Sequence, residues 1–315
     1  DYKAIKGHHI ETVAGDPSTI QIGDIWYNST LGKLRGGKLG AGSWASGGDM
    51  NQARRGQNGI GTSTAAIAFG GGPTAETGAG GGLSETYNGS SWTEGADLNT
   101  ARNIMGAAGV SSTSALAIAG SGVIDNVESW NGTAWTELAD INTARDGSAG
   151  AGTTTAALYA CGGSPPKIDS VESWDGSSWT EIADANTARA AHAGSGIQTA
   201  MLIFGANSPT RGITEEWNGS SWTEVADLGT ARYYLGGAGT VSKTIAIGGT
   251  EPAKANTEEW DGSSWSEKAD LSTARYLGAP GHVDAEDTLY GGGGPNMVTT
   301  EEWTQAVAAS SITSS

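Results

Sequence analysis

The 315-residue chain has little of several residue types that other folds require. Its single cysteine, Cys161, excludes an internal disulfide, and the apolar neighbours of this residue (LYACGG) predict a buried thiol in a strand. No run of 18 apolar residues occurs, and the N-terminal stretch DYKAIKGHHIETVAGDP lacks the apolar segment of a secretory signal. The sequence therefore predicts a chain that has no disulfide and does not insert into a membrane.

Positive charge is also scarce, with 17 Lys and Arg against 34 Asp and Glu, a net charge of −17. The imbalance lies in residues 44–315, which carry 12 basic and 30 acidic residues, whereas residues 1–43 carry five and four. A body this acidic repels phosphate backbones. We therefore expect no nucleic-acid partner.

Glycine and tryptophan are abundant, with 51 and 12 residues. Many small residues with scattered large aromatic ones favour short, closely packed strands joined by tight turns. The same composition is a poor match for long helices.

A phrase such as SWDGSSWTEIADANTAR, at 173–189, occurs six times along the chain. Its arginines are spaced 48, 43, 44, 43 and 43 residues apart, with a tryptophan ten residues before each and an aspartate halfway between. The arginines are Arg54, Arg102, Arg145, Arg189, Arg232 and Arg275; the tryptophans are Trp44, Trp92, Trp135, Trp179, Trp222 and Trp265; the aspartates are Asp49, Asp97, Asp140, Asp184, Asp227 and Asp270. Spacing this regular indicates one structural unit copied six times.

Each unit reads as four short antiparallel strands. In one copy, a small-residue run (147–153) precedes an apolar run ending at Gly-Gly (156–163), a variable loop, VESW (171–174) and WTEIAD (179–184). The turn between the last two strands is NGSS, NGTA or DGSS, which is typical of tight hairpins. The third strand carries a glutamate two residues before its aromatic residue, so both share a face. These pairs are Glu85/Tyr87, Glu128/Trp130, Glu172/Trp174, Glu215/Trp217, Glu258/Trp260 and Glu301/Trp303.

The two ends of the repeat complement each other, because the strand ending at Trp303 lacks a successor and the strand at Trp44 lacks a predecessor. Four strands in a period of this length match a propeller blade. We therefore expect an all-β, six-bladed β-propeller of four-stranded blades, closed by pairing of the N- and C-terminal strands. Such pairing removes two open sheet edges.

The Gly-Gly after the second strand, the aromatic residue on the third and the tryptophan on the fourth resemble Kelch-type repeats over residues 44–303. The repeated phrase, preceded by GDIWYN, is also similar to virion proteins of bacteriophages, especially marine ones. The first resemblance implies a propeller, and the second implies a place on an extracellular phage particle.

Residues that recur in all six copies of the repeat are expected to form the scaffold, and residues that differ between copies are candidates for a binding site. We expect each recurring arginine and glutamate to form an ion pair within its blade, and each recurring aspartate to cap the turn into the next blade. Residues that differ between blades follow the repeated arginines, and we expect them to share one face with the variable second-to-third-strand loops. The candidate ligand-binding residues are Arg55, Asp146, His192, Tyr233, Tyr234 and Tyr276, which could stack on and hydrogen-bond to a sugar.

Catalytic and metal-binding patterns are weak. The His8-His9 pair has no further ligands at metal spacing, and no glycine-rich phosphate loop follows a strand and opens a helix. We therefore expect no cofactor, no bound metal and no enzyme activity. An alternative is a glycan-degrading enzyme that pairs Asp146 with Glu251 or Glu76.

The segment 1–43 stands outside the repeat and is predicted to be an arm with a small hairpin, whose apolar residues Ile25, Trp26 and Tyr27 attach it to other virion proteins. Residues 304–315 are expected to form a flexible or partner-ordered tail. The complete prediction is a non-enzymatic tail, fibre or capsid appendage, present as a homo-oligomer or in multiple copies on the particle, whose propeller face binds host polysaccharide or protein. Decoration of the capsid or tail without a host ligand is the other alternative.

Overall fold

The computed structural model describes residues 10–73, 81–163, 166–207 and 212–312, and these residues form two compact units. Unit 1 combines residues 1–42 with 305–315, and unit 2 comprises residues 43–304. Strands form seven four-stranded sheets, and the described residues contain no helix. The predicted all-β class is confirmed.

Unit 2 holds six of these sheets. In each sheet the strands neighbour one another in the order of the repeat, and we label them a, b, c and d from the first to the fourth. The strands, sheet by sheet, are β5 (Arg55–Thr62), β6 (Ala65–Gly72), β7 (Ser84–Tyr87) and β8 (Trp92–Glu94); β9 (Gly106–Ser111), β10 (Ser114–Gly120), β11 (Ile124–Trp130) and β12 (Trp135–Glu137); β13 (Ala149–Gly152), β14 (Ala157–Gly162), β15 (Ile168–Trp174) and β16 (Trp179–Glu181); β17 (Ala193–Ile197), β18 (Ala200–Phe204), β19 (Thr214–Trp217) and β20 (Trp222–Glu224); β21 (Gly236–Thr240), β22 (Lys243–Ile247), β23 (Thr257–Trp260) and β24 (Trp265–Glu267); and β25 (Ala279–Pro280), β26 (Asp287–Gly291), β27 (Thr300–Thr304) and β4 (Ser43–Ser46).

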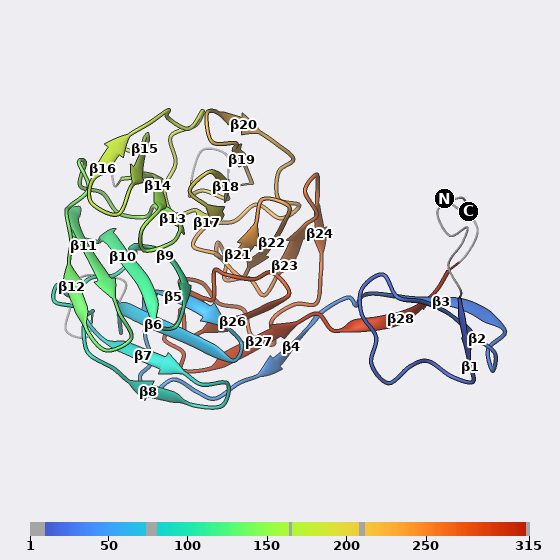
Figure 1. The fold of residues 1–315 in the computed structure, drawn as a ribbon. Helices are drawn as coiled ribbons and strands as arrows, with labels where there is room; N and C mark the ends of the chain where they lie inside the picture. Colours follow the sequence, from blue (N-terminus) through green and yellow to red (C-terminus); the bar gives the residue numbers. More distant parts are fainter. Residues whose placement is uncertain (1–9, 74–80, 164–165, 208–211, 313–315) are drawn as a thin grey trace. The chain divides into compact units, whose positions relative to one another are not determined.

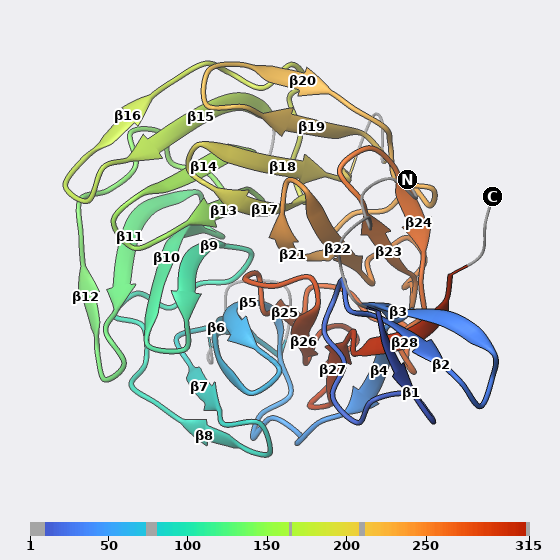
Figure 2. The same ribbon diagram turned by 45° about the vertical axis from the view of Figure 1, so that its right-hand side comes forward.

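The arrangement of unit 2 is propeller-like, with the a strands toward the middle and the d strands at the periphery (Figures 1 and 2). All pairings within its six sheets are antiparallel, as the repeat predicts. The predicted pairing of the chain ends is present, since β27 pairs with β4 and places Trp303 opposite Trp44.

The c–d turns show why the repeated Asn-Gly and Asp-Gly sequences form tight connections. In one turn the side-chain oxygen of Asn131 accepts hydrogen bonds from the amides of Thr133 and Ala134, both at 3.0 Å. Gly132 follows with φ of 95°, a conformation that side chains with Cβ atoms rarely adopt. The same geometry places the c-strand aromatic residue opposite the d-strand tryptophan.

These aromatic pairs form much of the core. Ring centroids in the six pairs are 4.9 to 5.6 Å apart, which is contact distance for tilted rings. Most of the indoles are buried, whereas Trp44 and Trp265 are half-buried. Several d-strand indoles also donate to the neighbouring sheet, for example Trp135 Nε1 to Ser84 Oγ at 3.0 Å. The aromatic residues therefore hold adjacent sheets together as well as filling them.

Unit 1 contains the seventh sheet, whose strands are β1 (Glu11–Val13), β2 (Ile25–Asn28), β3 (Lys33–Leu39) and β28 (Val307–Ser311). The predicted hairpin is present as the β2–β3 pair, and β1 adds to β2 in parallel. The expected division of the chain differs at the C-terminus. Residues after Trp303 do not stand apart as a tail, because β28 pairs antiparallel with β3 and satisfies the backbone of that strand.

Candidate functional site

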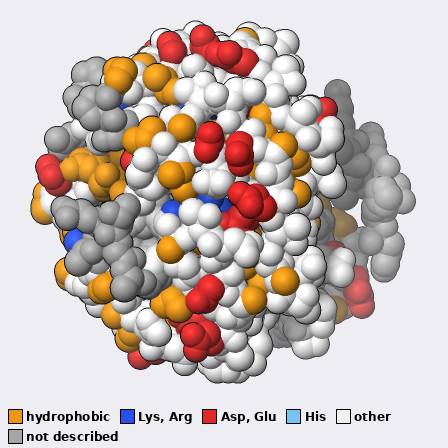
Figure 3. All heavy atoms as spheres, turned by 90° about the vertical axis from the view of Figure 1, so that its left-hand side faces the viewer, with side chains coloured by type: hydrophobic (Ala, Val, Ile, Leu, Met, Phe, Trp, Pro, Cys, Tyr) orange, Lys and Arg blue, Asp and Glu red, His pale blue; other side chains and the backbone are white. Residues whose placement is uncertain are grey.

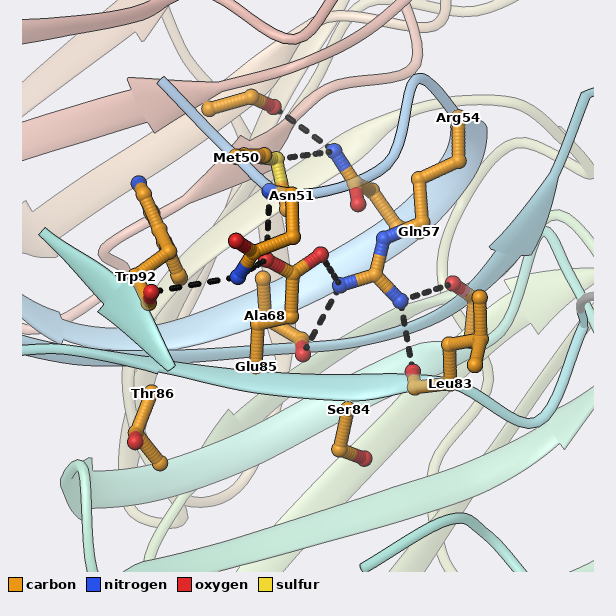
Figure 4. A network of polar contacts seen from close by, with 12 residues as sticks. Met50, Asn51, Arg54, Gln57, Ala68, Leu83, Ser84, Glu85, Thr86 and Trp92 are labelled. Atoms are coloured by element: carbon orange, nitrogen blue, oxygen red, sulfur yellow. Dashed lines mark hydrogen bonds and ion pairs between the residues drawn. The ribbon is translucent and has the colours of Figure 1, made fainter. Parts of the chain in front are cut away.

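The repeated arginines and glutamates form the scaffold beneath the candidate site. Each arginine pairs with the c-strand glutamate of its own sheet, and both side chains are buried. In the first sheet, Arg54 Nη2 lies 3.0 Å from Glu85 Oε1, and Arg54 Nη1 donates to the carbonyl of Leu83 at 2.6 Å (Figure 4). Burial lowers the pKa of Arg54, and the negative charge of Glu85 opposes that shift. The predicted ion pairs are confirmed as structural groups.

The second oxygen of each glutamate holds the segment that enters the sheet. Glu85 Oε2 accepts from the backbone amide of Asn51 at 2.8 Å, and the other five glutamates accept from the equivalent amides at 2.7 to 2.8 Å. The expectation that the repeated aspartates cap this turn is therefore wrong. Those aspartates are exposed, and the turn amides donate their hydrogen bonds to the buried glutamates instead.

A cycle of six backbone hydrogen bonds surrounds the middle of unit 2. The residue two positions after each repeated arginine donates its amide to the equivalent carbonyl of the preceding sheet, at 2.7 to 3.1 Å. All six residues have positive φ, between 53° and 74°, which turns the chain from the periphery into strand a. They are Gly56, Ile104, Gly147, Ala191, Tyr234 and Leu277. We call this set the amide ring.

The candidate residues from the sequence lie at or beside the amide ring. Arg55, Asp146, Tyr233 and Tyr276 each precede a ring residue, Tyr234 is a ring residue, and His192 follows one. Described residues of two variable b–c connections contact this set. The amide of Gly163 donates to the Asp146 carbonyl at 2.8 Å, and that of Gly294 donates to the Tyr276 carbonyl at 2.7 Å.

The side chains of this set form two contacting groups. Arg55 Nη1 donates to the hydroxyl of Tyr276 at 3.2 Å, and both residues are half-buried. The rings of Tyr233 and Tyr234 are tilted against each other with centroids 5.1 Å apart. Aromatic faces beside a guanidinium group are well suited to stacking on a ring-shaped ligand.

Asp146 precedes the amide-ring residue Gly147 and interacts electrostatically with Tyr234. Burial raises the pKa of Asp146, and burial together with the charge of Asp146 raises the pKa of Tyr234. The residue as a whole is half-buried.

A cavity of about 60 Å³ lies inside the amide ring and includes Tyr234 and His192 in its lining. His192 is only 7% exposed, and its imidazole lies next to the backbone of Ala160. Burial, assisted by the charge of Arg189, lowers the pKa of His192 to about 3, so the imidazole is neutral at physiological pH.

His282 is a site residue that the sequence prediction missed. Five glycines occupy the equivalent place seven residues after the repeated arginine, at or near the C-terminal end of strand a: Gly61, Gly109, Gly152, Gly196 and Gly239. His282 adopts φ of 61°, and its Nε2 donates to Asn58 Oδ1 at 2.7 Å. The imidazole borders both the 60 Å³ cavity and a second one of about 10 Å³, so it divides the centre of unit 2. Comparing all six copies at this position would have revealed it.

The predicted attachment residues lie in unit 1 and differ in exposure. Ile25 and Tyr27 are 38% and 39% exposed, whereas Trp26 is 3% exposed and donates its indole N–H to Asp16 Oδ1 at 3.1 Å. Alternation along β2 accounts for this difference, since successive side chains point to opposite faces. Trp26 thus forms the core of the arm, and its neighbours form the surface.

Three further expectations concern Cys161, the carboxylates considered with Asp146, and metal binding. Cys161 is fully buried, as expected, and burial raises the pKa of its thiol to about 12. Of the carboxylates considered with Asp146, Glu251 is exposed and Glu76 lies outside the described residues. Within the described ranges, no three His, Cys, Asp or Glu side chains gather as metal ligands.

The outer surface agrees with the acidic composition. Figure 3 shows Asp and Glu side chains spread over the side of unit 2 that it draws, with few Lys or Arg side chains among them. In the part of the chain that is described, no helix is long and apolar enough to span a bilayer.

No protein-family model matches the chain, and no curated protein matches it either. The function is therefore inferred from the geometry of the amide ring and its surroundings.

Proposed function

We propose that unit 2 is a closed six-bladed β-propeller of the Kelch type that presents the amide-ring face to a ligand. Support for six blades comes from the six sheets of this unit and from the cyclic order of the amide-ring hydrogen bonds. Support for closure comes from the pairing of β27 with β4. Propellers carry many unrelated functions, so the ligand has to be inferred from the site.

We further propose that the protein is a non-enzymatic appendage of a bacteriophage virion that binds host-surface glycan or protein. The observation that carries this proposal is chemical variety at equivalent positions. Around a repeated backbone frame, the residues preceding the amide ring are Arg55, Asn103, Asp146, Ala190, Tyr233 and Tyr276. Unlike groups on a rigid frame provide a surface that recognises one asymmetric ligand.

Unit 1 supplies the attachment to other virion proteins in this proposal. Five of the eight exposed large hydrophobic residues among the described residues belong to this small unit: Ile22, Ile25, Tyr27, Leu31 and Ile312. Apolar side chains concentrated in this way favour a protein interface. Many copies on one particle would raise the avidity of a weak ligand site.

Gold labelling of purified virions with an antibody against residues 43–304 tests the location. Label at tail tips or fibre ends supports host recognition, label spread over the capsid supports decoration without a host ligand, and no label overturns the virion assignment. A glycan array then tests binding with the full chain. The Arg55→Met and Tyr233→Ala variants should lose at least about tenfold in affinity, equivalent to ~1.4 kcal/mol. Exposed Glu181→Gln, on the peripheral strand β16, is the control.

A glycan-degrading activity is the second candidate, and the raised pKa of Asp146 favours it because a general acid must hold its proton near neutral pH. Incubation of the protein with capsular polysaccharides and measurement of reducing ends tests it. Turnover that Asp146→Asn abolishes would replace the binding proposal with an enzyme.

A further inference from the structure

The c–d turns occur in two chemical forms at the same place of the repeat. Three begin with an asparagine and two with an aspartate, and a glycine with φ between 88° and 95° follows in each. In all five turns the amide of the first residue donates to the carbonyl of the fourth at 3.2 to 3.3 Å. The first residues are Asn88, Asn131, Asn218, Asp175 and Asp261, and all are exposed. The same backbone turn therefore accommodates a carboxamide and a carboxylate.

The side-chain oxygen of each asparagine lies among three hydrogen-bond donors. Asn131 Oδ1 accepts from the amides of Thr133 and Ala134, both at 3.0 Å, and from the Thr133 hydroxyl at 2.8 Å. Asn88 and Asn218 accept from the equivalent three groups at 2.8 to 3.0 Å. Fixed donors around one oxygen stabilise negative charge that develops on it during a reaction.

The aspartate turns show that these donors stabilise a negatively charged oxygen. Asp175 Oδ1 accepts from the amides of Ser177 and Ser178, both at 2.8 Å, and from the Ser177 hydroxyl at 2.7 Å. The Ser177 hydroxyl and the two amides lower the pKa of Asp175 to about 2. Asp261 has the equivalent donors at 2.8 to 2.9 Å, and they lower its pKa as well.

We propose that the three Asn-Gly turns are sites of spontaneous deamidation, in which the donors of the turn promote conversion of asparagine to aspartate. The aspartate turns of the other two sheets represent the product. This inference depends on the c–d turns alone and is independent of the proposed ligand and of the proposed place on a virion.

The reaction at Asn131 needs only hydroxide and water. Hydroxide removes the amide proton of Gly132, and the nitrogen attacks Cγ of Asn131. A C–N bond forms while the electron pair of the Cγ–Oδ1 double bond moves onto Oδ1, where the three donors lie. Collapse breaks the Cγ–Nδ2 bond, and ammonia leaves after taking a proton from water. Water then opens the cyclic imide, at Cγ to give aspartate or at the main-chain carbonyl to give isoaspartate.

The chain contains one further Asn-Gly sequence, Asn58-Gly59 in strand β5, and this one should resist the reaction. Asn58 Nδ2 donates to the carbonyl of Met105 at 2.9 Å, and its Oδ1 lies 2.7 Å from His282 Nε2. A carboxylate would lose the donation to Met105. Gly59 is also buried, which keeps hydroxide from its amide.

Deamidation of the turns changes the charge of the protein and leaves its fold intact. Each conversion to aspartate adds one negative charge, so complete reaction adds three to a net charge of −17. Asp175 and Asp261 already occupy equivalent turns, so the product fits the same backbone. The extent of conversion therefore records the age of a protein molecule.

Peptide mass spectrometry tests the proposal on the full-length protein. Samples are incubated at mildly alkaline pH in buffer or in concentrated urea, and are then digested with pepsin in acid, where the attacking amide keeps its proton. Fragment spectra measure conversion at each of the four Asn-Gly sites. The three turns should convert at least as fast in the folded protein as in urea. Asn58 should convert at least about tenfold more slowly when folded, because reaction there requires local opening.

One variant isolates the contribution of a single donor. Thr133→Val removes the hydroxyl and keeps the size of the side chain, so it should slow conversion of Asn131 by about three- to tenfold. Asn88 and Asn218 in the same molecules should keep their rates. Thr136→Val, at an exposed position of β12, is the matched control and should leave all rates unchanged.

Three results would overturn the proposal. They are slower conversion of the turns in the folded protein than in urea, conversion of folded Asn58 at the rate of the turns, and an unchanged rate at Asn131 in Thr133→Val. None of these results bears on glycan binding or on the labelling of virions, so failure of this inference is distinguishable from failure of the proposed function.

Discussion

The indole of Trp44 lies against that of Trp303, with ring centroids 5.4 Å apart, so the first and last strands of unit 2 meet through their aromatic side chains. Trp44 also donates its Nε1–H to Thr257 Oγ1 of the neighbouring sheet at 2.9 Å. One residue near the N-terminus thus contacts two sheets from the C-terminal part of unit 2.

Trp44→Ala should destabilise unit 2 by about 2 kcal/mol. A fully buried tryptophan costs about 3–5 kcal/mol when truncated, and Trp44 is half-buried. Urea unfolding followed by circular dichroism measures the loss. Trp222→Ala, in an internal sheet, should destabilise unit 2 by about 3–5 kcal/mol, because Trp222 is buried. A loss below about 0.5 kcal/mol for Trp44→Ala would mean that the end strands contribute nothing to stability.

Glu215→Gln should cost about 3–5 kcal/mol, because it leaves the Arg189 guanidinium buried without a counter-charge. The adjacent Glu216 points to the other side of β19 and is half-buried, so Glu216→Gln is the matched control and should change stability by less than about 0.5 kcal/mol. Thermal and urea unfolding of both variants check the difference. Equal losses would contradict the structural role of the buried pair.

The c–d turn can be tested by exchange between copies of the repeat. Asn131→Ala removes the acceptor of two turn amides and should cost about 1 kcal/mol. Asn131→Asp should be nearly neutral, since Asp175 accepts from the equivalent amides of Ser177 and Ser178 at 2.8 Å. Unfolding midpoints distinguish the variants, and a neutral alanine variant would show that Gly132 alone determines the turn.

Stability should fall as the pH falls below about 6.5, the value for an unfolded histidine. The pKa of His192 is about 3 in the folded protein, so the unfolded chain binds the extra proton first. The stabilisation is therefore complete above the unfolded pKa and is lost progressively toward pH 3, at up to about 1.4 kcal/mol per pH unit.

Urea unfolding at several values between pH 7 and pH 4 measures this slope. The comparison with His192→Leu isolates the histidine from titrating carboxylates, and the variant should show a shallower slope. The pKa of His282, lowered by burial to about 4, gives the same direction of change. Identical slopes in His192→Leu and the unmodified protein would contradict the buried, neutral state of His192.

The repeat made much of this architecture predictable from sequence alone. Six copies of the glutamate and arginine at fixed spacing indicated the buried pairs, and the unmatched ends at Trp44 and Trp303 indicated their pairing. Sequence spacing could not show which acid reaches the turn amide, because Asp49 and Glu85 are both compatible with it. The burial of the two side chains decides which one accepts the hydrogen bond: Glu85 is buried and accepts from the amide of Asn51, whereas Asp49 is exposed.

The candidate site was predictable only in outline. The position after each repeated arginine indicates Tyr233 and Tyr276, whereas His282 differs from its scaffold only when it is compared with the five glycines at equivalent positions. Strand β28 was also missed, since the small residues of AVAASSITSS carry no clear alternation and its partner β3 lies at the other end of the chain. The alternation of residues within one strand carries little information about which distant strand it pairs with.

The two connections between unit 1 and unit 2 leave from facing residues, Ser43 of β4 and Thr304 of β27. A mechanical load on unit 1 is consequently shared by two covalent tethers that start at one point. The two strands that receive this load, β4 and β27, are hydrogen-bonded to each other. A protein held by its arm under the drag of moving fluid would gain resistance to unravelling from this double attachment.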